Sequence, residues 1–131
     1  MAHLELVSVI VDDYDPAIRF FVDVLGFELV EDSPALSTNT GAAKRWVVVR
    51  PRGAVTGIVL ARADGETQRA AIGEQFAGRV GLFLRVDDFD AVLAKLRAAN
   101  VEIIGAPRSE PYGRVCVFRD LAGNRWDLLG R

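Results

Sequence analysis

The sequence predicts an α+β fold made of two tandem modules, each with the order strand, helix, strand, strand, strand. The strongest observation is a repeat: five residues beginning at Val11 (VDDYD) recur from Val86 as VDDFD. Each copy follows an apolar, strand-like run and precedes a helical pattern, and an internal repeat of this kind fixes the architecture of a chain. We expect a single domain over 1–131, with module one at about 1–63, a linker at about 64–78 and module two at about 79–131.

Module one is expected to begin with a strand at 4–11, whose two faces are both mainly apolar. A helix follows, with Asp15 as its N-cap, Pro16 at the first helical position and Gly26 as its C-terminal cap. The remaining elements are a strand at 27–30, a loop at 32–44 with a short strand at 35–37, and strands at 46–50 and 57–62.

The linker is expected to contain a helical turn at 67–72, and module two then repeats the same order of elements. Its helix begins after Asp88 or Asp90 and ends at Asn100, the residue that best replaces glycine in a left-handed cap. The expected strands are 79–86, 101–104, 114–119 and 125–129, with a loop at 107–113 and a turn at 120–124.

Composition narrows the classes of function. Half of the residues are hydrophobic and 26% are charged, which is typical of a soluble globular protein. The net charge of −2 gives no electrostatic basis for binding nucleic acid or a membrane surface. No apolar run reaches the roughly 20 residues that span a bilayer, and the N-terminus lacks the pattern of a secretion signal. The single cysteine, Cys116, forms no internal disulfide, so we expect a cytoplasmic protein.

Superposing the two modules separates the faces of their strands. With Val11 placed on Val86, one shared face is apolar throughout and is expected to pack against the helices. The opposite face is mixed, which suits a ligand cavity better than a dry core. This mixed face pairs Leu4 with Arg79, Leu6 with Gly81, Ser8 with Phe83, Ile10 with Arg85, and, on the closing strands, Val59 with Asp127.

Three segments carry a resemblance to a known family: AIRFF at 17–21, LGF at 25–27 and FRDLAGNRWDL at 118–128. With the repeat, they resemble the vicinal oxygen chelate superfamily of glyoxalase I, extradiol dioxygenases, and fosfomycin and bleomycin resistance proteins. The resemblance implies βαβββ modules whose curved mixed sheet encloses a cup, with helices outside. It also implies a homodimer, because many members are homodimers and some build each cup from modules of different chains.

Metal-using relatives carry His, Gln or Glu at four cup-facing positions, which the resemblance places here at Leu6, Val59, Gly81 and Asp127. Only Asp127 can ligate a metal, whereas a retained divalent ion needs roughly three or four protein ligands. We therefore expect no metal and no other cofactor. A slipped register that offers His3 and Glu5 beside Asp127 would restore a divalent metal site, and it remains the minor alternative.

The expected ligand-binding residues follow from the cup face. Arg79 and Arg85 would hold a ligand carboxylate or phosphate, or be neutralised by nearby acids. Asp127 could act as a general base, although an ion pair with a cup arginine such as Arg125 is the preferred interpretation. Trp46 could line an aromatic slot or pack in the core. The full expected set is Leu6, Ser8, Trp46, Val59, Arg79, Gly81, Phe83, Arg85 and Asp127.

Other residues have weaker assignments. Cys116 is expected to be a buried, inert thiol, because only His3 could activate it. Tyr112 and Gly113 could form a lid or an ordinary turn, and Gln75 and Phe76 could reach the cavity.

Three functions compete. The leading hypothesis is a metal-independent module that binds a small aromatic or anionic compound, as the bleomycin resistance branch does. The second is a metal-dependent lyase, isomerase or dioxygenase of the same superfamily. The third is a regulatory or interaction subunit with a vestigial cup, which predicts no pocket above roughly 300 Å³.

Overall fold

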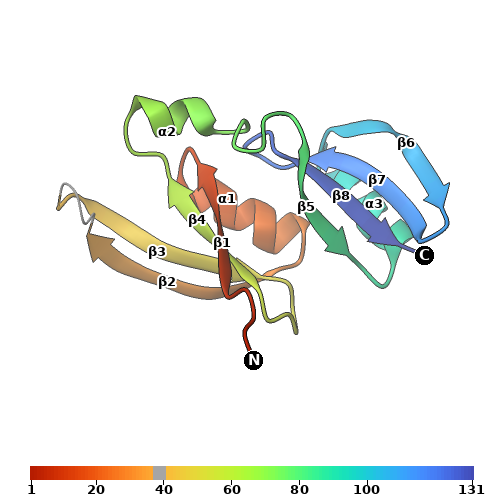
Figure 1. Ribbon diagram of the computed structural model, residues 1–131, viewed down its shortest axis with the longest axis horizontal. Helices are drawn as coiled ribbons and strands as arrows, with labels where there is room; N and C mark the ends of the chain where they lie inside the picture. The colour runs from red at the N-terminus through yellow and green to blue at the C-terminus, as the bar shows by residue number, and fades with distance from the viewer. Residues whose placement is uncertain (37–40) are drawn as a thin grey trace. The chain divides into compact units, whose positions relative to one another are not determined.

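The computed structural model describes residues 1–36 and 41–131. The chain divides into two compact units, Met1–Ala70 and Ala71–Arg131, and the boundary falls within the expected linker. Each unit holds one four-stranded sheet, ordered β1-β4-β3-β2 in unit one and β5-β8-β7-β6 in unit two (Figure 1). The matching strand orders confirm the predicted α+β fold of two βαβββ modules.

Unit one pairs β1 with β4 in parallel, while β3 runs antiparallel to both β4 and β2. The helix α1 packs against β3 and β4 and continues into a wider π-helical turn, η1. The elements are β1 (Leu6–Val11), α1 (Tyr14–Arg19), η1 (Phe20–Val24), β2 (Glu28–Leu36), β3 (Ala43–Arg50), β4 (Gly57–Arg62) and α2 (Glu66–Ala71), which fills the predicted linker turn.

Unit two repeats this plan, with β5 parallel to β8 and β7 antiparallel to β8 and β6. The helix α3 packs against β8. The elements are β5 (Val80–Arg85), α3 (Phe89–Ala98), β6 (Ile103–Glu110), β7 (Gly113–Arg119) and β8 (Arg125–Gly130).

The predicted loops at 32–44 and 107–113 are wrong over most of their length. In unit one, β2 and β3 form a long hairpin that pairs from Glu28 opposite Arg50 to Leu36 opposite Ala43. In unit two, β6 continues to Glu110. Composition misled the prediction because the described residues of these two segments are largely polar and none of them is buried, yet many of their backbone groups pair within a hairpin. Ser37, at the end of the expected strand 35–37, lies outside the described residues.

The first helix is capped by Asp13 rather than by Asp15. The backbone of Asp13 is extended, and its carboxylate accepts a hydrogen bond from the Tyr14 N–H at 2.8 Å. Pro16 therefore lies at the third helical position, where the missing N–H still costs nothing because the first N–H groups of a helix have no acceptor within it.

The other caps follow the prediction. Asp88, one of the two residues considered, caps α3 and accepts from the Ala91 N–H at 3.0 Å. Gly26 and Asn100 both adopt positive φ, at 74° and 57°, and each ends its helical segment.

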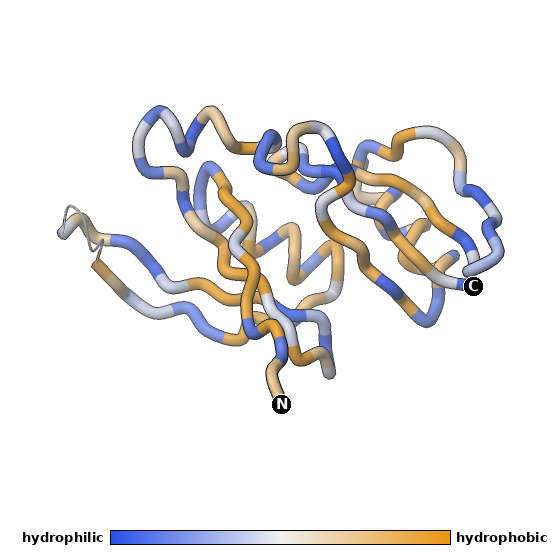
Figure 2. The backbone as a smooth tube through the Cα atoms, in the orientation of Figure 1, coloured by the Kyte–Doolittle hydropathy of each residue, from blue (hydrophilic) through white to orange (hydrophobic). Residues whose placement is uncertain are grey.

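The core of each unit lies between the helix and the apolar face of the sheet. In β1, Val9 and Val11 are fully buried while the preceding Ser8 is exposed, so the face assigned to the helix is the buried one. Figure 2 shows hydrophobic residues along most of β1 and β4. Among the described residues, no helix is long and apolar enough to cross a membrane. The largest buried side chains are Phe21 and Leu60 in unit one, and Phe89, Leu96, Phe118 and Leu128 in unit two.

Candidate functional site

The face of the unit-one sheet opposite α1, here called the open face, carries the exposed residues Ser8 and Trp46 and the buried residues Val48 and Val59. Ser8 lies opposite Val59 in the parallel pair, and Val59 lies opposite Val48 in the antiparallel pair, so these three side chains form one row. Trp46 lies two residues from Val48 on β3 and shares this face. Its side chain is 39% exposed, so Trp46 lines the open face and does not pack in the core.

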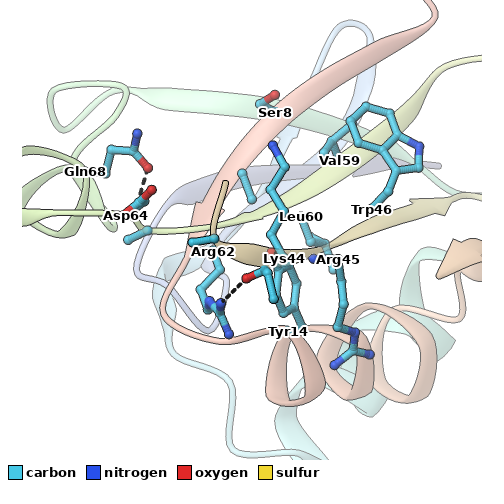
Figure 3. A pocket seen from close by; sticks show the side chains of 14 residues that line it. Ser8, Tyr14, Lys44, Arg45, Trp46, Val59, Leu60, Arg62, Asp64 and Gln68 are labelled. Atoms are coloured by element: carbon cyan, nitrogen blue, oxygen red, sulfur yellow. Dashed lines mark hydrogen bonds between the residues drawn. The ribbon is translucent and has the colours of Figure 1, made fainter. Parts of the chain in front are cut away.

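A hollow of about 370 Å³ lies at the start of β3 and the end of β4 (Figure 3). Ser8, Trp46 and Val59 line it from the open face. Figure 3 shows the Trp46 ring on one side of the strands and the Arg45 side chain on the other. The rest of the lining comes from Tyr14, residues 42–45 and 60–64, and Gln68.

A second hollow of about 330 Å³ adjoins the first, because Trp46 lines both. Leu6, Val48 and Gly57 supply much of its apolar floor. Trp46 therefore lies between two concave regions, each lined by both polar and apolar groups, and small molecules bind in concave surfaces of this kind.

Two cations at the first hollow carry no carboxylate partner among the residues that the structure describes: Lys44 and Arg62. Lys44 is exposed. The Arg62 guanidinium lies 5.0 Å from the centre of the Tyr14 ring and donates to the Ala43 carbonyl at 3.3 Å. Asp64 lines the same hollow and is the nearby acid that offsets part of this positive charge. The local charge still favours an anionic group.

Arg45 is different, because two carboxylates neutralise it. Its guanidinium donates to Asp15 at 2.9 Å and to Asp32 at 2.7 Å. The hydrogen bond from Arg45 lowers the pKa of Asp32, and the two acids raise the pKa of Arg45. The Arg45 N–H also donates to the Tyr14 hydroxyl at 3.1 Å. Arg45 thus links β3 to Asp15, Asp32 and Tyr14 at the edge of the hollow, and its charge is already neutralised.

In unit two, Phe83 and Asp127 lie opposite each other on β5 and β8. Phe83 is 64% exposed. Burial raises the pKa of Asp127, and the positive charge of Arg108 partly opposes this. Within residues 1–36 and 41–131, Asp127 forms no ion pair, so the expected pair with a cup arginine is not formed there. Arg125 instead donates to the Gly78 carbonyl at 3.2 Å.

Gly81 is covered by an aromatic ring. A Cβ atom built on Gly81 would collide with the ring of Phe76, a residue of the linker in the same unit. Any side chain at this position must first displace Phe76. Of the two expected cup arginines, Arg85 is exposed on β5, whereas Arg79 lines a separate small cavity.

The residues at the four metal positions do not fit a metal ion. Leu6, Val59 and Gly81 have no ligating side-chain atom, and Phe76 occupies the space above Gly81. His3 and Glu5 are exposed, precede β1 and lie 3.5 Å from each other. No cluster of three or more His, Cys, Asp or Glu side chains suited to a metal occurs in the described parts of the chain.

Cys116 is buried on β7, and burial raises the pKa of its thiol. A thiol that resists ionisation is a poor nucleophile, which agrees with the expected inert role. Tyr112 lies exposed in the short turn between β6 and β7.

The sequence reasoning missed Lys44, Arg62 and Tyr14 as lining residues. Lys44 could not be assigned to a strand face because its segment was predicted to be a loop, whereas β3 begins at Ala43. The repeat did mark Tyr14, whose counterpart in unit two is Phe89, but it could not show that the tyrosine lines a hollow.

Comparisons with known proteins agree with this architecture. Residues 1–128 match the Glyoxalase/Bleomycin resistance protein/Dioxygenase superfamily. A protein of Shewanella frigidimarina is 42% identical over 124 residues, covering 94% of this chain and 89% of its own. The structure of TnmS3, an antibiotic binding protein from a Streptomyces species, is 33% identical, with a TM-score of 0.77 over 99% of this chain and 96% of that one. UcmS2 is 30% identical, with a TM-score of 0.79 over 98% of each chain.

The match covers both modules, and the element order, the parallel β1–β4 and β5–β8 pairs and the two helix caps all lie within it. The chain belongs to the Glyoxalase/Bleomycin resistance protein/Dioxygenase superfamily.

Proposed function

We propose that this protein binds a small aromatic anion without a metal ion, on the open face of its unit-one sheet. The observation that carries the proposal is that Trp46 lies between two hollows, with Lys44 on the same face of β3 and with Arg62 lining the first hollow from the other side of the sheet, beside Tyr14. An indole face contributes a large apolar contact with a defined geometry. The two cations supply charge-assisted hydrogen bonds to a carboxylate, sulfonate or phosphate.

The volumes of the two hollows favour a ligand-binding protein over a regulatory subunit with a vestigial cup. The hollows of about 370 and 330 Å³ both exceed the roughly 300 Å³ at which ligand pockets begin. The antibiotic binding protein TnmS3, which shares this fold at 33% identity, also supports a binding role. The donor set supports metal independence, because three of the four family metal positions offer no ligand atom. We further propose a homodimer, as in many relatives, which a molar-mass measurement in solution tests directly.

The fluorescence of Trp46 can report ligand binding. The chain has two tryptophans, and Trp126 is 2% exposed, so a quencher or ligand reaches Trp46 first. We expect 1-naphthoate to change the tryptophan fluorescence in a saturable manner. The neutral 1-naphthamide and the non-aromatic cyclohexanecarboxylate should each bind about tenfold more weakly, because each lacks one of the two recognised features. Equal affinity for all three compounds would contradict an aromatic-anion site.

Two variants locate the site. By calorimetry, Trp46→Ala should weaken naphthoate binding about tenfold through the lost aromatic contact. Lys44→Ala should weaken it about threefold, as expected for a rim charge. Lys95→Ala removes the other lysine, which is exposed on α3, and is the matched control with unchanged affinity.

Metal independence has its own test. Protein purified without chelator should contain far less than one equivalent of Zn, Mn, Ni or Fe by elemental analysis. Treatment with EDTA should leave naphthoate binding unchanged, because the recognising groups are an indole and two cations. A stoichiometric metal that EDTA removes together with ligand binding would favour the metal-dependent lyase, isomerase or dioxygenase instead.

A further inference from the structure

The two hollows that meet at Trp46 differ in charge. Lys44 and Arg62 line the first hollow and outnumber its acid, Asp64. A third cation of this hollow, Arg45, is already neutralised by its two carboxylate partners. The first hollow therefore favours a negative group. The charged lining of the second hollow, of about 330 Å³, consists instead of two glutamates and one arginine.

The arginine of the second hollow, Arg50, has a carboxylate partner outside the hollow. Its Nη2 donates to Glu28 at 2.8 Å, and its Nε donates to the same oxygen at 3.2 Å, so this cation is neutralised. Glu31 forms no ion pair within residues 1–36 and 41–131 and accepts a hydrogen bond from the Ser33 hydroxyl at 2.9 Å. A neutral hydroxyl leaves the negative charge of Glu31 in place.

The other glutamate of the second hollow, Glu5, precedes β1 and lies 3.5 Å from His3. One histidine, protonated or not, does not offset the two carboxylates of Glu5 and Glu31. Both glutamates are exposed, so a ligand in the hollow can reach them. The second hollow therefore favours a positive group, opposite to the first.

Lys44, Trp46 and Glu31 follow one another along the open face. Lys44 and Trp46 flank Arg45 on β3, so their side chains share one face of the sheet. Glu31 on β2 is the antiparallel partner of Val48, the next residue of β3 on this face. The step from Lys44 to Val48 spans about 13 Å, at about 3.3 Å for each residue of a strand. A positive end, an indole and a negative end thus lie in a row.

We propose that the ligand of this face is a zwitterion: an elongated aromatic compound with an anionic group at one end and an ammonium group at the other. The inference rests on the proposed aromatic-anion site and adds the second charge. The anionic group lies at Lys44, the rings lie against Trp46, and the ammonium group lies in the second hollow at Glu31. An ammonium group in a hollow lined by an indole also gains from the negative face of that ring.

Calorimetry with three biphenyl compounds tests the second charge. Biphenyl-4-carboxylate carries the anion alone, 4′-(aminomethyl)biphenyl-4-carboxylate adds an ammonium group at the far end, and 4′-(hydroxymethyl)biphenyl-4-carboxylate carries a neutral group of similar size there. The aminomethyl compound should bind about fivefold more tightly than the hydroxymethyl compound, as expected for an exposed ion pair beside an aromatic ring. Equal affinity of these two compounds would overturn the zwitterion and leave the aromatic-anion site standing. Absence of binding by all three would contradict that site, and the zwitterion with it.

Two variants locate the ammonium group. Glu31→Gln should reduce the preference for the aminomethyl compound to below about twofold and should not weaken the binding of biphenyl-4-carboxylate. Because Glu31 is exposed, this variant should fold normally. Asp23→Asn is the control, because it removes one negative charge from an exposed position of η1, which continues the helix on the other side of the same sheet. The control should keep the fivefold preference. A preference that survives in Glu31→Gln, or that is lost equally in both variants, would overturn the proposal.

Discussion

Asp120→Asn is expected to lower the free energy of unfolding by about 3 kcal/mol, because the buried carboxylate accepts five hydrogen bonds. One oxygen accepts from three backbone N–H groups of the β7–β8 turn. The other accepts from the Trp126 indole N–H at 2.9 Å and from the Asn124 amide. An amide at residue 120 would place an NH₂ donor against one of these sets of donors, and the side chain is only 5% exposed to water.

Urea unfolding followed by circular dichroism measures this loss. Asp87→Asn is the matched control, because it makes the same change of charge and volume at an exposed position just before α3. We expect the control to change stability by less than about 0.5 kcal/mol. If Asp120→Asn behaved like Asp87→Asn, the carboxylate would not be what holds the β7–β8 turn.

The repeat that predicted the fold also has a structural explanation. In unit one, Arg45 on β3 lies over the Tyr14 ring and pairs with Asp15. In unit two, Arg114 on β7 lies over the Phe89 ring, 4.4 Å from its centre, and pairs with Asp90 at 2.8 Å. Each copy of the repeated aromatic–Asp pair is thus clamped by an arginine from the third strand of its own module.

This clamp shows why the sequence predicted the modules so well. The repeated residues are a buried aromatic ring and an acid at the start of each helix, and those positions also mark where strand gives way to helix. The alternation of buried and exposed residues in β1 and β5 followed from the same superposition. The arginines themselves were not predicted, because more residues separate β2 from β3 than separate β6 from β7, so the superposition does not align Arg45 with Arg114.

The candidate site was harder to predict from the sequence, because only strands with a counterpart in the repeat could be assigned a face. Leu6, Ser8 and Val59 could be assigned to the open face by strand parity alone. Trp46 and Lys44 could not, because β3 has no sequence counterpart that fixes its register. Phe76 was suspected of reaching a cavity, but only coordinates could show that its ring lies over Gly81.

Gly81→Ala is expected to destabilise unit two by about 2 kcal/mol, the typical cost of forcing extra volume into a packed site. Its added methyl group would meet the Phe76 ring. Phe76→Ala, which leaves a space instead, should also destabilise the protein, by about 2 kcal/mol for a half-buried ring.

The double variant Gly81→Ala/Phe76→Ala decides whether these two residues act through each other. Because the methyl group then enters the space left by the ring, we expect the combined loss to fall short of the sum by about 1–2 kcal/mol, measured by urea unfolding. Strictly additive losses would show that Phe76 does not cover Gly81. The coupling bears on chemistry as well, since a histidine or glutamate side chain at residue 81 would need the space that the Phe76 ring occupies. The glycine and the phenylalanine together therefore oppose a metal ligand on β5.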